Sequence, residues 1–142
     1  MNILFFLTPK SEVAFLYEDE SLQQALEKME EKRYSCVPII TREGKYAGTM
    51  SEGDLLWTVR HMSFSDLEKA KNVPILTILR RSTYKPVHVN SKMEDLLDRA
   101  INQNFVPVVD DSEAFIGIIT RKEIIKYCYE RLKRLSALEG DE

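Results

Sequence analysis

The chain carries the same pattern of residues twice. Six positions in its first half recur in its second half with identical or similar side chains, each displaced by 69 residues: Pro38, Gly48, Ser51, Asp54, Leu55 and Leu56 match Pro107, Gly117, Thr120, Glu123, Ile124 and Ile125. An apolar run at 3–7 is echoed at 75–79, displaced by 72. Self-similarity at a fixed spacing indicates one structural unit used twice. Two such units packed about a pseudo-twofold axis leave two equivalent clefts, and clefts of this kind are frequent ligand sites.

Composition narrows the class of protein. With 142 residues, of which 44% are hydrophobic and 30% charged, the chain has the composition of one globular domain. Its net charge of -3 gives no basic excess of the kind that nucleic-acid-binding proteins carry. The apolar run at 3–7 is too short for a signal peptide or a membrane span. Cys36 and Cys128 match no zinc or CxxC spacing, which favours a reducing compartment, so we expect a soluble cytoplasmic protein.

The predicted elements follow the same order in both halves: a short helix, a strand, an amphipathic helix, two strands and a closing helix. The amphipathic helices rest on apolar side chains three and four residues apart, namely Leu22, Ala25, Leu26 and Met29, then Met93, Leu96, Leu97 and Ala100. The other helices are expected at 2–7, 73–79, 52–61 and 121–135, and the strands at 13–17, 86–89, 36–40, 105–109, 46–50 and 114–119.

This order predicts an α/β (α+β) fold in which tandem βαββα repeats are related by a pseudo-twofold axis. The first repeat is expected at 1–61 and the second at 73–135. Residues 62–72 are predicted to form a linker, a loop with one helical turn, and the tail at 136–142 is expected to fray.

Two stretches, 48–54 and 117–123, carry the most informative motif. A Ser or Thr followed three residues later by an acid is a capping box at a helix start, and this explains either stretch alone. It does not explain the Gly three residues before the hydroxyl, nor the Pro ten residues before that Gly, which occur in both halves. The joint pattern is therefore far more specific than a helix cap.

That joint pattern resembles the cystathionine β-synthase (CBS) domain, in the paired arrangement called a Bateman module. The resemblance covers about 2–135 and rests on Pro38 through Asp54 and, with one change, on Pro107 through Glu123. It is closest to small stand-alone bacterial CBS-pair proteins, some of which bind cyclic di-AMP. The resemblance implies a non-catalytic sensor that binds AMP, ATP, S-adenosylmethionine or cyclic di-AMP, forms dimers and signals to a partner, here an unidentified effector protein.

In this family each cleft is crossed, with the base pocket from one repeat and the phosphate-binding helix start from the other. The first cleft would then combine Glu12, Val13, Ala14, Tyr34, Ser35 and Cys36 with Thr120, Arg121, Lys122 and Glu123. The second would combine Tyr84, Lys85, Pro86, Asn104, Phe105 and Val106 with Ser51 and Asp54.

The two clefts differ in charge and in the acid at the helix start. A helix N-terminus binds phosphate, and Asp54 could accept hydrogen bonds from both hydroxyls of a ribose, whereas Glu123 is one methylene longer. The positive end of the helix dipole disfavours the cations Arg121 and Lys122 at this helix start, so a bound anion would offset the repulsion. The alternative is that both side chains simply point into solvent. We expect a cyclic dinucleotide in the Arg121 cleft and a mononucleotide in the Asp54 cleft.

Two further residues of the first cleft leave alternatives open. Tyr34 could stack on adenine or be a half-buried residue at a strand start. Glu12 would repel phosphate unless it faces the exocyclic amine of the base.

The closing helices carry more apolar residues than one inner face needs, which predicts a homodimer. These residues are Leu55, Leu56, Trp57 and Val59, with Ile124, Ile125, Cys128, Tyr129 and Leu132. The sequence contains no Walker loop, GxGxxG, nucleophile elbow or HExxH motif, and His61 and His88 have no metal-ligand pattern, so neither an enzyme nor a metal site is predicted. No membrane or nucleic acid polymer is expected as a partner. The alternative function is a dimeric interaction scaffold that needs no ligand.

Overall fold

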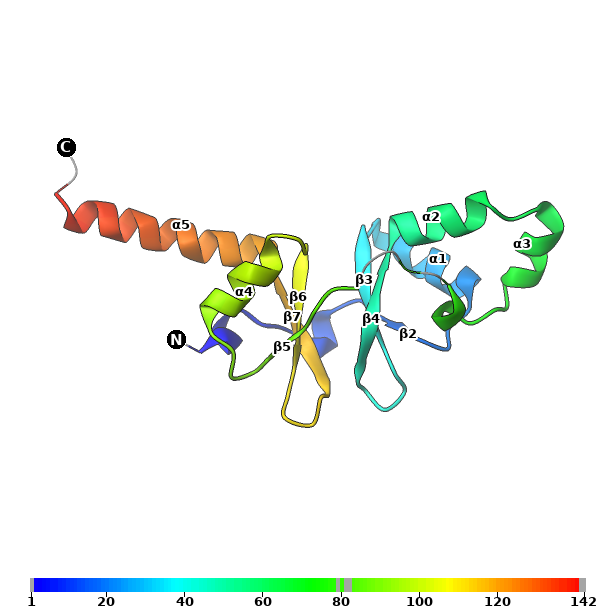
Figure 1. The fold of residues 1–142 in the computed structure, drawn as a ribbon, viewed down its shortest axis with the longest axis horizontal. Helices are drawn as coiled ribbons and strands as arrows, with labels where there is room; N and C mark the ends of the chain where they lie inside the picture. The colour runs from blue at the N-terminus through cyan, green and yellow to red at the C-terminus, as the bar shows by residue number, and fades with distance from the viewer. Residues whose placement is uncertain (1, 79, 81–82, 141–142) are drawn as a thin grey trace.

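Two small β-sheets lie at the centre of the molecule, and helices cover their outer sides (Figure 1). The computed structural model describes residues 2–78, 80 and 83–140. In chain order the elements are η1 (Ile3–Phe6), β1 (Thr8–Pro9), η2 (Lys10–Glu12), β2 (Leu16–Tyr17), α1 (Leu22–Lys32), β3 (Cys36–Ile40), β4 (Tyr46–Ser51), α2 (Glu52–Arg60), α3 (Phe64–Ala70), η3 (Ile75–Thr77), β5 (Val87–His88), α4 (Met93–Ala100), β6 (Phe105–Val109), β7 (Phe115–Thr120) and α5 (Arg121–Leu138), where η marks a 3₁₀ turn.

The two sheets share one pairing scheme. The first has the order β2-β3-β4 and the second β1-β7-β6-β5. In the first sheet β3 pairs in parallel with β2 and antiparallel with β4. In the second sheet β6 likewise pairs in parallel with β5 and antiparallel with β7. The strand register even shifts at matching places, between Ile39 and Ile40 and again between Val108 and Val109. The predicted α/β fold of tandem repeats is therefore confirmed.

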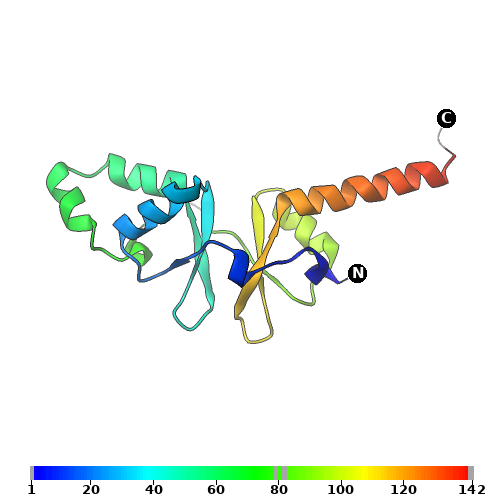
Figure 2. The same ribbon diagram turned by 180° about the vertical axis from the view of Figure 1, so that it is seen from behind.

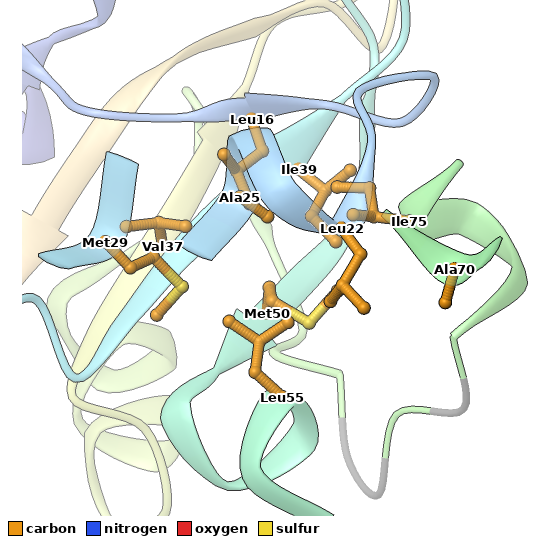
Figure 3. Packing of buried hydrophobic residues seen from close by; sticks show 10 residues of the cluster. All are labelled: Leu16, Leu22, Ala25, Met29, Val37, Ile39, Met50, Leu55, Ala70 and Ile75. Atoms are coloured by element: carbon orange, nitrogen blue, oxygen red, sulfur yellow. The ribbon is translucent and has the colours of Figure 1, made fainter. Parts of the chain in front are cut away.

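Each repeat lends its leading segment to the core of the other. Ile3 of η1 is 1% exposed and packs among the buried residues of the second repeat. Ile75 of η3 is 0% exposed and completes the first core (Figure 3). Seen from either side, the N-terminal segment crosses to lie beside the second repeat (Figures 1 and 2). Neither core is complete without this exchange, so the two repeats form one interlocked body.

Backbone hydrogen bonds hold the exchanged segments in place. The N–H of Ile75 donates to the carbonyl of Glu20 at 2.7 Å. At the other end of the molecule, β1 pairs antiparallel with β7, so that Pro9 lies opposite Gly117. An added Cβ at Gly117 would overlap the backbone oxygen of Thr8, and its φ of +154° is disfavoured for other residues. Glycine is therefore required where the N-terminal strand meets the second repeat.

Equivalent residues meet at the centre, as a pseudo-twofold axis requires. Lys45 forms an isolated antiparallel bridge with Ala114, the residue 69 positions later. The neighbouring pair, Tyr46 and Phe115, stacks with ring centroids 6.3 Å apart and an interplanar angle of 25°. Two residues at matching positions of a duplication can touch only near the axis that relates the copies. The axis thus passes close to the two hairpins.

Several predicted boundaries differ from the structure. The leading segments are single 3₁₀ turns rather than helices, and η3 ends at Thr77 because the backbone of Ile78 is already extended. The last residue of the helix predicted at 73–79 lies outside the described part of the chain. The strand predicted at 13–17 is reduced to Leu16–Tyr17, the two residues that pair with β3. The strand predicted at 86–89 is reduced to Val87–His88, the two residues that pair with β6. The linker contains a two-turn helix, α3, whose Ala70 is buried in the first core. Helix α5 continues to Leu138, beyond the predicted end.

Candidate functional site

The contacts between the two repeats form a polar seam, made by Cys36, Tyr46, Thr49, Tyr84 and Asn104. The hydroxyl of Tyr46 donates to the carbonyl of Tyr84 at 2.6 Å, so the Thr49 hydroxyl, 2.7 Å away, must donate to Tyr46. The Sγ atom of Cys36 lies 3.4 Å from the Tyr84 hydroxyl and accepts from Asn104 Nδ2 at 3.8 Å. These bonds join the two repeats, and three of the residues that make them, Cys36, Tyr84 and Asn104, are residues predicted for the clefts.

Both tyrosines of the seam keep their protons at neutral pH. Burial raises the pKa of Tyr46 well above its ordinary range, against the opposing effect of its Thr49 hydrogen bond. Burial also raises the pKa of Tyr84, and the hydrogen bond to Cys36 adds to this effect. Both hydroxyl groups are therefore neutral hydrogen-bonding groups, with no role as bases.

A first hollow of about 380 Å³ lies between the segment before β2 and the end of α1. Four predicted residues of the first cleft, Glu12, Val13, Ala14 and Tyr34, line it together. Half of the remaining lining is apolar, from Phe15, Leu16, Met29 and Val37, and half is polar or charged, from Ser11, Lys28, Glu31 and Lys32. An apolar wall with an aromatic ring and a few polar groups suits a flat heteroaromatic ring.

A second hollow, of about 240 Å³, occupies the corresponding place in the second repeat. Two predicted residues, Tyr84 and Lys85, line it. The other lining residues are polar or charged: Thr83, Asp98, Arg99, Asn102 and Gln103. The Nε atom of Arg99 is buried and has no hydrogen-bond partner among the described residues. The two hollows are thus alike in position and unlike in chemistry.

The two predicted helix starts are capped by their own side chains. The N–H of Asp54 donates to Ser51 Oγ at 3.0 Å, and the N–H of Ser51 donates to Asp54 Oδ2 at 3.0 Å, a complete capping box. Asp54 is only 5% exposed. At α5 the N–H of Glu123 donates to Thr120 Oγ1 at 3.3 Å. Local capping therefore accounts for the spacing of the hydroxyl and the acid, and ribose binding by Asp54 stays a prediction.

Each helix start lies beside the strand start of its own repeat. The backbone carbonyl of Ser35 accepts a hydrogen bond from the N–H of Glu52 at 2.9 Å, and the backbone carbonyl of Asn104 accepts one from the N–H of Arg121 at 2.9 Å. The Nε of Arg121 also donates to the carbonyl of Gln103 at 2.9 Å. Neither hollow is lined by residues 51–54 or 120–123. The crossed grouping of the two clefts therefore remains a prediction.

The remaining predicted site residues vary in accessibility. Phe105 and Val106 are 6% and 0% exposed, because β6 is one of the two inner strands of its sheet. Val106 packs in the second core, and the ring of Phe105 lies against that of Tyr84. Pro86 is half-buried, and Lys122 is exposed.

Sequence reasoning missed Gln103 and Arg80. Gln103 is buried at 7% exposure, and its carboxamide bonds to the backbone of Lys85 and Phe105. One sequence signal could have identified Gln103: it stands 69 residues after Tyr34, so it is the equivalent residue of the second repeat, with an amide where the first repeat has an aromatic ring. The guanidinium of Arg80 lies against Gly48, 3.1 Å from the point where a Cβ would be. No repeat in the sequence pointed to Arg80.

Apolar surface gathers on the outer helices. A groove of about 630 Å³ lies between α1 and α2, and one of about 440 Å³ lies between α4 and α5. The exposed apolar residues of the closing helices are Leu56, Trp57, Ile125, Tyr129, Leu132, Leu135 and Leu138. Two residues predicted for this surface, Leu55 and Ile124, are instead 4% and 1% exposed, because they face the two cores.

Within the described ranges no group of three or more His, Cys, Asp or Glu side chains is placed to hold a metal ion. None of the described helices combines the length and the apolar character needed to cross a membrane.

Two interlocked βαββα units, each with a hollow at the corresponding place, define a tandem-repeat module. A family model of the CBS domain matches residues 6–61 and 78–130. The chain therefore belongs to the CBS domain family, as a pair of domains, and CBS-pair proteins are generally non-catalytic regulatory modules.

Two relatives by sequence differ greatly in length. The chain is 31% identical over 120 residues to the A-adding tRNA nucleotidyltransferase of Aquifex aeolicus (strain VF5). The matched region covers 84% of this chain but only 14% of that enzyme. The chain is 20% identical over 131 residues to cyclic di-AMP receptor B of Bacillus subtilis (strain 168), covering 92% of this chain and 88% of the receptor.

Solved structures share the fold. CbpB in complex with c-di-AMP superposes with a TM-score of 0.78 at 24% identity, covering 96% of this chain and 90% of CbpB. CBSX2 in complex with AMP superposes with a TM-score of 0.70 at 24% identity, covering 91% and 96% of the two chains.

Proposed function

We propose that this CBS pair is a cytoplasmic regulatory protein that binds an adenine nucleotide and signals its presence to a partner protein. The observation that carries the proposal is the first hollow, where Val13, Ala14 and Tyr34 form a wall suited to adenine. The ligand class is supported by relatives of this fold, one named a cyclic di-AMP receptor and others solved with c-di-AMP or AMP.

Arg121 is the residue that favours a ligand with several phosphates. A guanidinium carries five N–H donors, so Arg121 can hold the Gln103 carbonyl through Nε and still offer others to a phosphodiester. Lys122 adds a second, exposed cation beside it. We therefore propose cyclic di-AMP as the ligand that uses Arg121, with one of its two bases in the first hollow.

The proposal includes a homodimer. Leu132 and Tyr129 on α5 are 65% and 58% exposed, and Leu56 on α2 is 58% exposed. Fully burying one large apolar side chain contributes about 1.5–3 kcal/mol, which here would stabilise the dimer. A second copy of the same chain offers equally apolar helices, so two copies can cover each other's surface.

A thermal-shift series with AMP, ADP, ATP, S-adenosylmethionine and cyclic di-AMP tests the proposal. A ligand present at 100 times its Kd stabilises the folded protein by about 2.7 kcal/mol, which raises Tm by several degrees. Arg121→Ala should lower the affinity for cyclic di-AMP. Arg134→Ala, which replaces an exposed arginine further along the same helix, should leave that affinity unchanged. No shift with any adenine compound would instead favour a scaffold that needs no ligand.

A further inference from the structure

Gln103 distinguishes the second hollow from the first. It stands 69 residues after Tyr34, and each of the two side chains lines the hollow of its own repeat. Tyr34 presents a ring, whereas Gln103 presents an amide that can both donate and accept hydrogen bonds. The duplicated position has therefore been given two different chemistries.

The carboxamide of Gln103 bonds to both polar groups of one backbone residue. The N–H of Lys85 donates to Oε1 at 2.9 Å, and Nε2 donates back to the carbonyl of Lys85 at 3.2 Å. The Nε2 group also donates to the carbonyl of Phe105 at 3.2 Å. With 7% of the residue exposed, this amide is buried and held by three hydrogen bonds.

Adenine would present the same hydrogen-bonding pair to this backbone. Its N7 acceptor lies next to the N6 amino donor, in the way that the amide oxygen lies next to the amide nitrogen. The N–H and carbonyl of Lys85 can therefore pair with either partner, and Gln103 already occupies them. A base that approached Lys85 would have to displace a satisfied, buried group.

We propose that Gln103 takes the place of an adenine edge and closes the second hollow to the base, so that the chain has one adenine site rather than two. The inference rests on the proposed function only in taking adenine as the ligand base. The lining agrees with it, since the first hollow is larger, at about 380 Å³ against 240 Å³. Half of the residues that line the first hollow are apolar, whereas those that line the second are polar or charged apart from Tyr84.

Isothermal titration with AMP, which carries one base, tests the proposal. Wild-type protein should bind one AMP per chain and Gln103→Ala two. We expect the opened second hollow to bind AMP roughly 100-fold more tightly than the closed one, because three buried hydrogen bonds no longer oppose the base. Asn102→Ala, which removes a neighbouring amide from the same hollow, should still bind one.

The outcomes separate this inference from the proposed function. Two AMP molecules on the wild type, no gained site in Gln103→Ala, or the same gain in Asn102→Ala would each overturn it. If Gln103→Ala bound one AMP and the wild type bound none, the closure of the second hollow by Gln103 would be supported. The same result would contradict the proposed binding of adenine in the first hollow.

A measurement on the wild type keeps the proposal testable if Gln103→Ala does not fold. In amide NMR spectra at saturating AMP, the Val13 resonance should move and the Lys85 resonance should stay. A comparable movement of the Lys85 resonance would overturn the proposal.

Discussion

The hydroxyl of Tyr46 donates a 2.6 Å hydrogen bond to the backbone carbonyl of Tyr84, and so ties the first repeat to the segment that opens the second. Tyr46 also stacks on Phe115, its own counterpart in the duplication. One side chain thus makes both a polar and an aromatic contact across the pseudo-twofold axis. The geometry of any site between the repeats depends on it.

Removing this hydroxyl should destabilise the whole protein. Tyr46→Phe keeps the ring but leaves the Tyr84 carbonyl and the Thr49 hydroxyl, which is 2% exposed, without their partner. We expect the free energy of unfolding to fall by about 1–3 kcal/mol, measured by urea denaturation. Tyr17→Phe, at a tyrosine of β2 whose hydroxyl makes no hydrogen bond among the described residues, serves as the control and should change stability by less than about 0.5 kcal/mol. Equal effects of the two variants would contradict the role given to Tyr46.

The same residue predicts loss of stability at alkaline pH. Because burial raises the pKa of Tyr46 in the folded state, the unfolded chain loses this proton first, at about pH 10. Folded protein then binds more protons than unfolded protein, so the free energy of unfolding is unaffected by Tyr46 below that pH and falls as the pH rises above it. Denaturation curves between about pH 8 and 11 should show a smaller fall in Tyr46→Phe. An identical fall in both proteins would exclude Tyr46 as the source.

The two equivalent glycines should differ in their tolerance of a methyl group. Both have φ near +150°, but a Cβ at Gly117 would overlap backbone of Thr8, whereas one at Gly48 would meet the flexible end of Arg80 at 3.1 Å. We expect Gly117→Ala to lower the free energy of unfolding by about 3 kcal/mol or more, and Gly48→Ala by about 1 kcal/mol. Chemical denaturation of the two variants checks this. Equal losses would mean that β1 does not pair with β7 as described.

The apolar face of α5 should hold two copies of the chain together. Sedimentation should show a dimer for the wild type and a monomer for Leu132→Glu, because an unpaired charge is costly to bury in an interface. Phe64→Glu, at an 81% exposed residue on α3 outside both helix grooves, should stay dimeric. A Leu132→Glu protein that remained dimeric would place the interface elsewhere.

How far the sequence predicted the structure depended on whether local signals agreed with distant contacts. The strands Cys36–Ile40 and Phe105–Val109 were predicted to the residue, because a short apolar run that is rich in β-branched side chains and bounded by polar turns indicates a strand. The exchange of Ile3 and Ile75 between the cores was not foreseen, because an apolar run specifies burial and does not specify against which repeat.

Local signals also explain why four residues predicted for the first cleft lie together, and their role in ligand binding stays a prediction. Glu12, Val13, Ala14 and Tyr34 line one hollow because they lie close in space through one turn and one helix end. The amide of Gln103 was overlooked, because a polar residue before a strand ordinarily belongs to a loop. Its meaning depends on the backbone of Lys85, 18 residues away, which only the folded structure brings to it.

A crystal structure with a bound adenine nucleotide would test the central claim most directly. The account predicts that the base lies against Val13, Ala14 and Tyr34 in the first hollow, with its phosphates directed toward Arg121 at the seam. A nucleotide found in one of the apolar helix grooves, or an empty first hollow in crystals saturated with AMP and with cyclic di-AMP, would contradict it.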